Sequence, residues 1–280
     1  MAEVQELIKI ASQVRRDIVR MVTAAKSGHP GGSLSSTEAM VALFFNVMKH
    51  DPATWTRDAK GADAFILSAG HIAPVYYSCL ARAGYFPVSE LATLRKFGTR
   101  LQGHPCVSHD LPGVFQPSGS LGQGVSVAAG LAIAKKMDGD ENRVYVLCGD
   151  GETEEGQIWE AAMFAAHHKL NNLVAITDWN CQQIDGRVEE VGGLVDLAEK
   201  WSSFGWNVVT VDDGHDFEKI LAAFDIAKSS ADKPTMILLQ TEMGHCVDFM
   251  AGTHKWHGKA PSEEQCAEAL AQLEETLGDY

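Results

Sequence analysis

Residues 144–186 have the sequence VYVLCGDGETEEGQIWEAAMFAAHHKLNNLVAITDWNCQQIDG, and this stretch decides the fold. The apolar runs 144–148 and 173–177 contain several β-branched residues and predict two buried strands. Between them, residues 155–169 carry apolar side chains at helical spacing and predict a helix. A strand, a helix and a second strand in this order form a βαβ unit, whose two strands are parallel.

Two polar side chains follow these strands directly. Asp150 lies in a Gly-Asp-Gly turn after the first strand, and Asn180 comes just after the second. Carboxyl ends of parallel strands meet at one edge of the sheet, where open α/β sheets bind ligands. Carboxylate and amide oxygens suit Mg²⁺ or Ca²⁺, and a glycine turn offers N–H groups to an anion. The stretch therefore predicts a divalent ion that holds a phosphorylated ligand; the alternative is a tight turn with a solvated aspartate.

The rest of the chain continues the alternation of strands and helices. Strands are predicted at 64–67, 207–211 and 235–240, and helices at 4–26, 37–48, 72–83, 88–97, 125–136, 194–204, 217–229 and 263–277. We expect N-caps at Ser35 or Ser36, at Ser89, and at Ser262 through a capping box with Gln265. Residues 98–117 lack periodicity and predict a long functional loop. The alternation predicts one α/β domain over residues 1–280, with a doubly wound, mostly parallel sheet and helices on both faces.

Four of the eleven histidines lie in glycine-flanked loops: His29, His71, His104 and His257. His71 directly follows a predicted strand end, so it belongs to the proposed ligand edge. Imidazole titrates near neutral pH and can donate or accept a proton, which suits proton transfer to carbonyl and hydroxyl oxygens. We expect these four side chains to surround one cleft, whereas the other histidines match no recognisable chemistry.

Composition excludes several classes of protein. The net charge of −14 argues against binding to nucleic acid or to an acidic membrane surface. No run of eighteen apolar residues predicts a membrane span, and the N-terminal residues lack the apolar core of a signal peptide. The six cysteines contain no Cys-X-X-Cys pair and are typical of reduced thiols in a cytoplasmic protein.

The Gly-Asp-Gly turn with an asparagine thirty residues after its aspartate is similar to the thiamine-diphosphate (ThDP) motif. More narrowly, the chain resembles the N-terminal, diphosphate-binding part of transketolases, and the shared motifs span nearly its whole length in the family's order. Besides the central motif they are Ser27-Gly-His-Pro-Gly-Gly-Ser33, Ser68-Ala-Gly-His71, Gly103-His-Pro105, Gly119-Ser-Leu-Gly-Gln-Gly124, Glu155-Gly156, Ile184-Asp-Gly186 and His257-Gly258.

The resemblance implies the ThDP-binding fold of the diphosphate (PP) domain and a set of ligands for ThDP and Mg²⁺, or Ca²⁺ or Mn²⁺ in its place. Asp150, Asn180 and the backbone carbonyl of Gln182 would bind the metal. The residues implied to lie against the cofactor are His71, Gly119, Ser120, Leu121, Gly151, Glu152, Asn180 and His257.

The resemblance also implies an activity and a partner. Transketolases move a two-carbon ketol unit from a ketose to an aldose, and His29, His71, His104 and His257 would contact substrate and cofactor. Glu155 would correspond to a carboxylate in the network that links paired active sites. The family activates its cofactor with a glutamate from a second, pyrimidine-binding domain, and transketolases are more than twice this length. The chain is therefore expected to be the N-terminal subunit of a split transketolase, which forms an α2β2 heterotetramer with a separate C-terminal subunit.

Departures from the family pattern leave the sugar open. Ser120 replaces a common proline, and Cys181-Gln182-Gln183 replaces the usual residues after the metal asparagine. The substrates could be the sugar phosphates of the pentose phosphate pathway, or a branched, deoxy or sulfonated sugar. Two other ThDP enzymes remain alternatives, half of a 1-deoxyxylulose-phosphate synthase and the 2-oxo acid dehydrogenase α subunit. A non-catalytic ThDP-fold binding module is a third.

Overall fold

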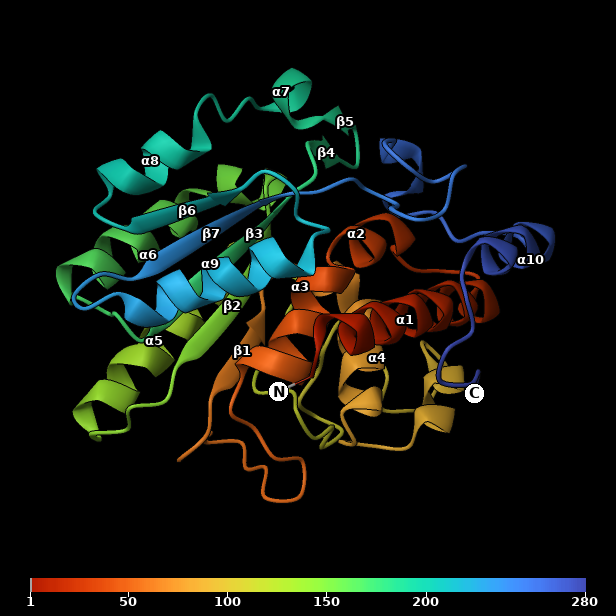
Figure 1. Ribbon diagram of the computed structural model, residues 1–280, viewed down its shortest axis with the longest axis horizontal. Coiled ribbons are helices and arrows are strands. Elements are labelled where there is room, and N and C mark those ends of the chain that lie inside the picture. Colours follow the sequence, from red (N-terminus) through yellow and green to blue (C-terminus); the bar gives the residue numbers. More distant parts are fainter. Residues whose placement is uncertain (1) are drawn as a thin grey trace.

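The computed structural model describes residues 2–280, and a five-stranded parallel sheet lies at its centre (Figure 1). Its strands are β1 (Ala64–Leu67), β2 (Val144–Gly149), β3 (Leu173–Trp179), β6 (Asn207–Val211) and β7 (Thr235–Gln240). The order across the sheet is β1-β2-β3-β7-β6, with every neighbouring pair parallel. The five predicted strands are confirmed, and their carboxyl ends share one edge.

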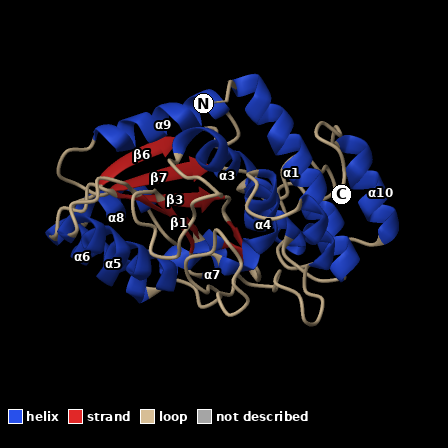
Figure 2. Cartoon of the chain, turned by 90° about the horizontal axis from the view of Figure 1, so that it is seen from below, coloured by secondary structure: helices blue, strands red, loops and turns tan. Residues whose placement is uncertain are grey.

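Helices cover both faces of the sheet, as Figure 2 shows. One face packs against α5 (Gln123–Met137), α6 (Gly156–His167) and α8 (Leu197–Ser203). The other packs against α1 (Val4–Ala25), α3 (Thr37–Ala42), α4 (Ala73–Arg82) and α9 (Phe217–Ser229). Side chains of successive strand residues point to opposite faces of the sheet. Val144 and Val146 pack on the face covered by α5, α6 and α8, and Tyr145 and Leu147 pack on the other face. Since both faces are buried, β1, β2 and most of β3 and β7 are apolar, whereas the edge strand β6 is only partly buried. The predicted α/β fold class is confirmed.

The remaining elements extend this framework. They are α7 (Val188–Val191), α10 (Glu263–Gln272), a β4–β5 hairpin (Gln182–Gln183, Gly186–Arg187), a π-helical turn (Leu43–Val47) and 3₁₀ turns (Gly70–Ile72, Val88–Thr93, Gly151–Glu154, His254–Trp256). The capping box at Ser262 and Gln265 is confirmed. No helix within residues 2–280 is long and apolar enough to cross a membrane.

Several local predictions are wrong. Residues Pro30–Ser35, which lie outside every predicted helix and strand, form the short helix α2, which is buried along its whole length. Its glycines permit this packing, because a Cβ on Gly31 would lie 2.8 Å from Met243 Cγ. Ser36 does occupy the predicted N-cap position of α3, but its side chain makes no capping hydrogen bond. The predicted helix 88–97 is a 3₁₀ turn that begins after Pro87, so Ser89 is not its cap.

Candidate functional site

A pocket of about 430 Å³ opens at the carboxyl edge of the sheet. Loops that follow β1, β2, β3 and β7 form its walls, together with α2 and the segment before α5. Its lining includes most of the residues predicted from the sequence: His29, His71, His104, Gly119, Leu121, Asp150, Gly151, Glu152, Glu155, Asn180, Gln182 and His257. Chain segments far apart in the sequence therefore converge on one site.

Asp150 and Asn180 lie at the ends of adjacent strands, as expected. Asp150 is 2 % exposed; its Oδ1 accepts the Gly151 N–H at 2.8 Å and its Oδ2 accepts the Cys181 N–H at 2.6 Å. The Asn180 side-chain amide donates to Asp178 Oδ2 at 2.9 Å, and its oxygen accepts the Gln182 N–H at 3.0 Å. Backbone N–H groups thus hold in place the Asp150 carboxylate and the Asn180 amide oxygen, the atoms that could bind a metal ion.

Asp178 is a further carboxylate at this edge that sequence reasoning missed. It is buried and accepts hydrogen bonds from Ser35 Oγ at 2.6 Å and from Thr241 Oγ1. Its position between a strand end and Asn180 was the only sequence signal, because Ser35 and Thr241 approach from distant segments. Burial raises the pKa of Asp178, and burial together with the charge of Asp178 raises the pKa of Asp150 to about 7.

The donor set fits a divalent cation bound to a diphosphate. Within residues 2–280, no lysine, arginine or histidine forms an ion pair with Asp150 or Asp178. Two neighbouring buried carboxylates without a cation are costly, so a bound ion would stabilise them. Hard carboxylate and amide oxygens are the ligands that Mg²⁺ prefers, so these residues suit an ion that would in turn hold a diphosphate.

The four predicted histidines meet in the pocket. The ring of His29 lies 5.1 Å from His71, 5.6 Å from His257 and 6.4 Å from His104, measured between centroids. Burial is the main cause that lowers all four pKa values, to about 4 for His29 and about 3 for His71. The rings are therefore neutral at pH 7 and can each donate or accept a proton. The buried Nδ1 atoms of His29 and His257 have no partner among the described residues, which favours a polar ligand between them.

Glu152 joins three loops of the site. Its carboxylate accepts the Gly122 N–H at 2.8 Å, the Gly149 N–H at 3.0 Å and the Ser68 hydroxyl. It lines the pocket, but these bonds occupy its oxygens. Of the other predicted residues, Glu155 lies exposed at the rim, whereas Ser120 is exposed outside the pocket in a neighbouring hollow.

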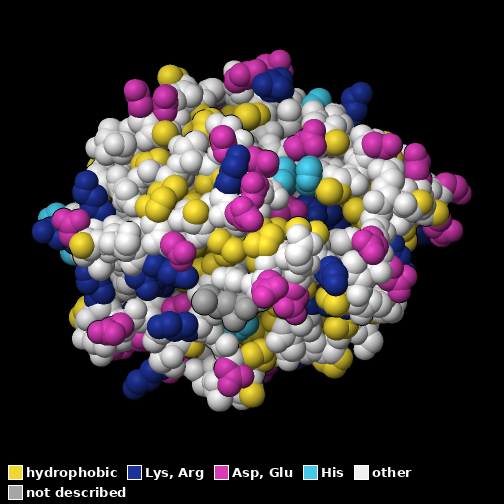
Figure 3. All heavy atoms as spheres, viewed as in Figure 1, with side chains coloured by type: hydrophobic (Ala, Val, Ile, Leu, Met, Phe, Trp, Pro, Cys, Tyr) yellow, Lys and Arg dark blue, Asp and Glu magenta, His cyan; other side chains and the backbone are white. Residues whose placement is uncertain are grey.

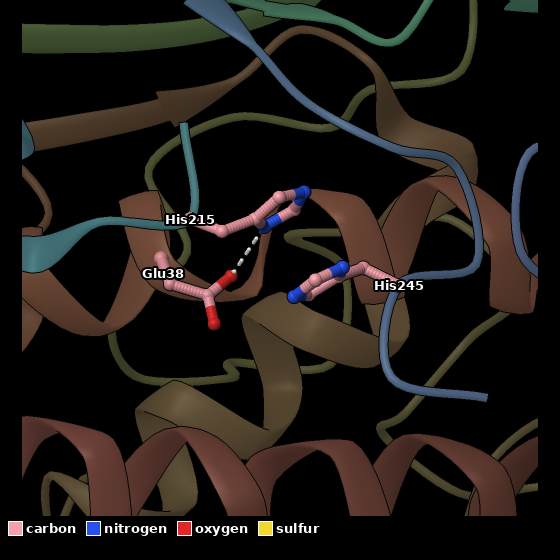
Figure 4. A group of neighbouring side chains, drawn as sticks. All are labelled: Glu38, His215 and His245. Carbon is pink, nitrogen blue, oxygen red and sulfur yellow. Dashed lines mark hydrogen bonds and ion pairs between the residues drawn. The ribbon is translucent and has the colours of Figure 1, made fainter. Parts of the chain in front are cut away.

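Glu38, His215 and His245 form a second cluster, whose potential ligand atoms lie within 4.8 Å of one another (Figure 4). The His215 ring already uses both nitrogens: Nδ1 contacts Glu38 at 3.0 Å and Nε2 accepts the Glu242 N–H at 2.9 Å. Arg15 binds the other Glu38 oxygen. The cluster therefore ties α3 to the loops after β6 and β7, and it is not a free ligand set.

Comparisons with known proteins agree with this geometry. The family model described as "Transketolase, thiamine diphosphate binding domain" matches residues 7–278. The 6-deoxy-6-sulfo-D-fructose transketolase subunit SqwG of Clostridium sp. (strain MSTE9) is 42 % identical over 94 % of this chain and 94 % of its own length. One of the apulose-4-phosphate transketolase subunits of Phocaeicola vulgatus is 38 % identical over 98 % of this chain and 96 % of its own.

Solved structures give the same result. The transketolase from Leishmania mexicana superposes with a TM-score of 0.90 at 33 % identity and covers 98 % of this chain. The match takes up 41 % of that longer chain, so the present chain spans about two fifths of it. By family model, sequence and structure, the chain belongs to the transketolase family and corresponds to its thiamine-diphosphate-binding domain.

Proposed function

We propose that this chain is the diphosphate-binding subunit of a two-chain transketolase. With a separate pyrimidine-domain subunit, in an α2β2 heterotetramer, it would transfer a two-carbon ketol unit from a ketose donor to an aldose acceptor. The relatives that match it over nearly their whole length are named as transketolase subunits, which supports a partner chain.

One observation carries the proposal: buried, cation-free carboxylates and a group of neutral histidines share a single pocket. The carboxylates suit a metal ion bound to a diphosphate, and the histidines suit sugar hydroxyls and a carbonyl oxygen. Asp150, Asn180 and the backbone carbonyl of Gln182 would bind Mg²⁺, or Ca²⁺ or Mn²⁺. When bound, ThDP supplies the nucleophile and the electron sink for cleavage of the carbon–carbon bond.

The protein's own groups bind, orient and move protons. His71 and His257, whose rings stack 5.1 Å apart, would lie near the reacting carbon, and His29 and His104 would contact sugar hydroxyls. Since these rings are neutral at pH 7, each can accept a proton from a hydroxyl or donate one to a carbonyl oxygen.

The remaining cofactor contacts belong to the pocket wall. Gly119, Leu121 and Gly151 would pack against the cofactor, whereas Glu152 would hold the loops that present them. Glu155 at the rim is placed for contact with a partner subunit.

The substrate is proposed to be a sugar that carries a phosphate or a sulfonate. The named relatives act on 6-deoxy-6-sulfo-D-fructose and apulose 4-phosphate, which favours a specialised sugar catabolism alongside the ordinary pentose phosphates. We also propose a cytoplasmic location, because all six cysteines are free thiols.

Reconstitution tests the proposal. The chain alone should show no ketol transfer, and addition of a pyrimidine-domain subunit from the same genome, with ThDP and Mg²⁺, should restore transfer from a ketose phosphate. Asp150→Ala and Asn180→Ala should each lower activity more than about 100-fold, because they remove direct ligands. Glu190→Ala, which removes an exposed carboxylate outside the pocket and outside the shared motifs, should leave activity unchanged.

Two results would contradict the proposal. One is robust turnover by the chain alone. The other is a reconstituted complex that uses pyruvate or branched 2-oxo acids but not ketose phosphates, which would indicate a different ThDP enzyme.

A further inference from the structure

Arg95 differs from nearly all other arginines of the chain. Seven of the nine arginines form ion pairs with carboxylates in the part of the chain that the structure describes. Arg95 and Arg143 do not. Arg143 directly precedes β2 and therefore lies at the amino edge of the sheet, away from the pocket. Arg95 is thus the unpaired guanidinium on the side of the site.

The backbone holds the Arg95 side chain in a defined place. Arg95 has φ +60°, a left-handed conformation that costs energy for a residue with a side chain, and its N–H donates to the Leu101 carbonyl at 2.8 Å. Its Nη2 donates to the Gly103 carbonyl at 3.3 Å. A Cβ on Gly103 would lie 2.5 Å from Arg95 Cζ, so the guanidinium packs directly against the backbone of this glycine.

This placement brings the guanidinium beside the segment that carries His104, a residue of the pocket wall. Gly103 is followed directly by His104, which lines the pocket and lies 6.4 Å from the ring of His29. The charge of Arg95 reaches both rings: after burial, it is a further cause that lowers the pKa of His104 and of His29. Within residues 2–280 the guanidinium makes a single side-chain hydrogen bond, so most of its N–H donors remain for a ligand.

We propose that Arg95 is a specificity-determining residue that binds the phosphate or sulfonate group of the sugar substrate beside the His104 segment. The inference rests on the proposed function, because it assigns the charged end of that substrate to this chain. A planar guanidinium pairs with two oxygens of a tetrahedral oxyanion at once. A local cation is needed because the chain carries a net charge of −14 and the pocket wall holds Asp150 and Asp178.

Arg100 provides a matched control. It lies five residues further along the same segment, but its Nε and Nη2 bind Glu90 at 2.8 and 2.7 Å. Arg100→Gln therefore removes a charge that is already neutralised, whereas Arg95→Gln removes an unpaired one.

The first test uses the complex reconstituted with its partner subunit. Arg95→Gln should lower kcat/KM for a ketose phosphate or a sulfonated ketose by roughly 10- to 100-fold, mainly through KM. For the neutral pair erythrulose and glyceraldehyde, which yields xylulose and glycolaldehyde, the change should stay below about 3-fold. Arg95→Lys should recover part of the loss, and Arg100→Gln should change neither reaction. The anionic ketose whose kcat/KM falls further in Arg95→Gln, the phosphate or the sulfonate, carries the group that Arg95 binds.

The second test is independent of catalysis. In the chain alone, inorganic phosphate and sulfate are titrated while the NMR signals of the His104 ring are followed. The signals should shift in the wild type and stay in place in Arg95→Gln, with the melting temperature of the variant unchanged. Equal losses of kcat/KM for charged and neutral sugars, or identical titrations of both proteins, would overturn the inference. If no variant of the complex transfers a ketol unit, the proposed function fails, and the titration still decides on Arg95.

Discussion

Asp178 shows how a single residue can orient a proposed metal ligand, Asn180. Its carboxylate accepts the Asn180 amide N–H at 2.9 Å, which leaves the Asn180 oxygen on the other side of the amide. Ser35 and Thr241 donate to the same carboxylate and fix it in turn. Partners that hold a ligand in this way influence metal affinity even though they do not touch the ion. Asp178 is therefore a positioning residue in our interpretation of the site.

We predict that Asp178→Ala weakens Mg²⁺ binding by about 10- to 100-fold, because the Asn180 amide loses its fixed orientation. Calorimetric titration of Mg²⁺ into the reconstituted complex with ThDP would measure this. The exposed Glu190→Ala serves as the control and should keep wild-type affinity. Unchanged affinity in Asp178→Ala would show that Asn180 is oriented by the Gln182 N–H alone.

At the level of elements, the sequence predicts correctly those helices and strands whose formation depends on residues close to one another in the chain. The five apolar strands and the capping box at Ser262 depend on neighbouring residues and were found correctly. The helix Pro30–Ser35 was missed because its glycines, which favour loops in isolation, are held by contacts with Met243 and Ile72. Asp178 was missed for the same reason: its partners come from distant segments, whereas Asp150 and Asn180 belong to one βαβ unit.

Helix α3 should depend strongly on Glu38. Both Glu38 and Arg15 are buried, with side chains 6 % and 5 % exposed, so Glu38→Ala leaves an unpaired buried guanidinium. We expect a loss of about 3–5 kcal/mol in the free energy of unfolding, measured by urea denaturation. Glu189→Ala breaks an exposed pair with Arg187 and should cost no more than about 1 kcal/mol. If Glu38→Ala lowered the free energy of unfolding no more than Glu189→Ala does, the cluster of Glu38, His215 and His245 would have no structural role.

The same pair makes α3 sensitive to acid. Although burial opposes ionisation, Arg15 and His215 hold the pKa of Glu38 at about 2. A carboxyl whose pKa is lower in the folded state stabilises the fold above its unfolded value. This contribution should therefore be lost as the pH falls from about 4.5 toward 2, and Glu38→Gln should lack that part of the pH dependence.

On the scale of the whole molecule, charge is spread unevenly between surface and interior. Figure 3 shows acidic and basic side chains interspersed over one face, where solvent screens them. The buried charges are instead paired across elements, as in Arg82 with Asp17 between α4 and α1. Four buried carboxylates have no ion pair among the described residues: Asp63, Asp150, Glu152 and Asp178. Three of them, Asp150, Glu152 and Asp178, line the pocket, which supports the proposed cation site there.

The C-terminal residues close the helical layer against α1, near the end marked C in Figure 1. Asp279 accepts hydrogen bonds from Arg16 at 2.9 and 2.7 Å, from Arg20 at 3.2 Å and from Gln13 at 2.9 Å. Because four donors on one helix share this carboxylate, Asp279→Ala should lower the free energy of unfolding by about 1–3 kcal/mol.

Glu275 separates this effect from simple charge removal. It lies 3.6 Å from Arg16 but is 54 % exposed, so Glu275→Ala should cost well under about 1 kcal/mol. Urea denaturation of both variants at neutral pH measures the difference, and hydrogen exchange in α1 locates it. If Asp279→Ala leaves the free energy of unfolding and the hydrogen exchange in α1 unchanged, the contact between Asp279 and α1 does not stabilise this helix. A selective increase of exchange in α1 would instead identify Asp279 as the contact through which the end of the chain supports the helix that precedes the His29 loop.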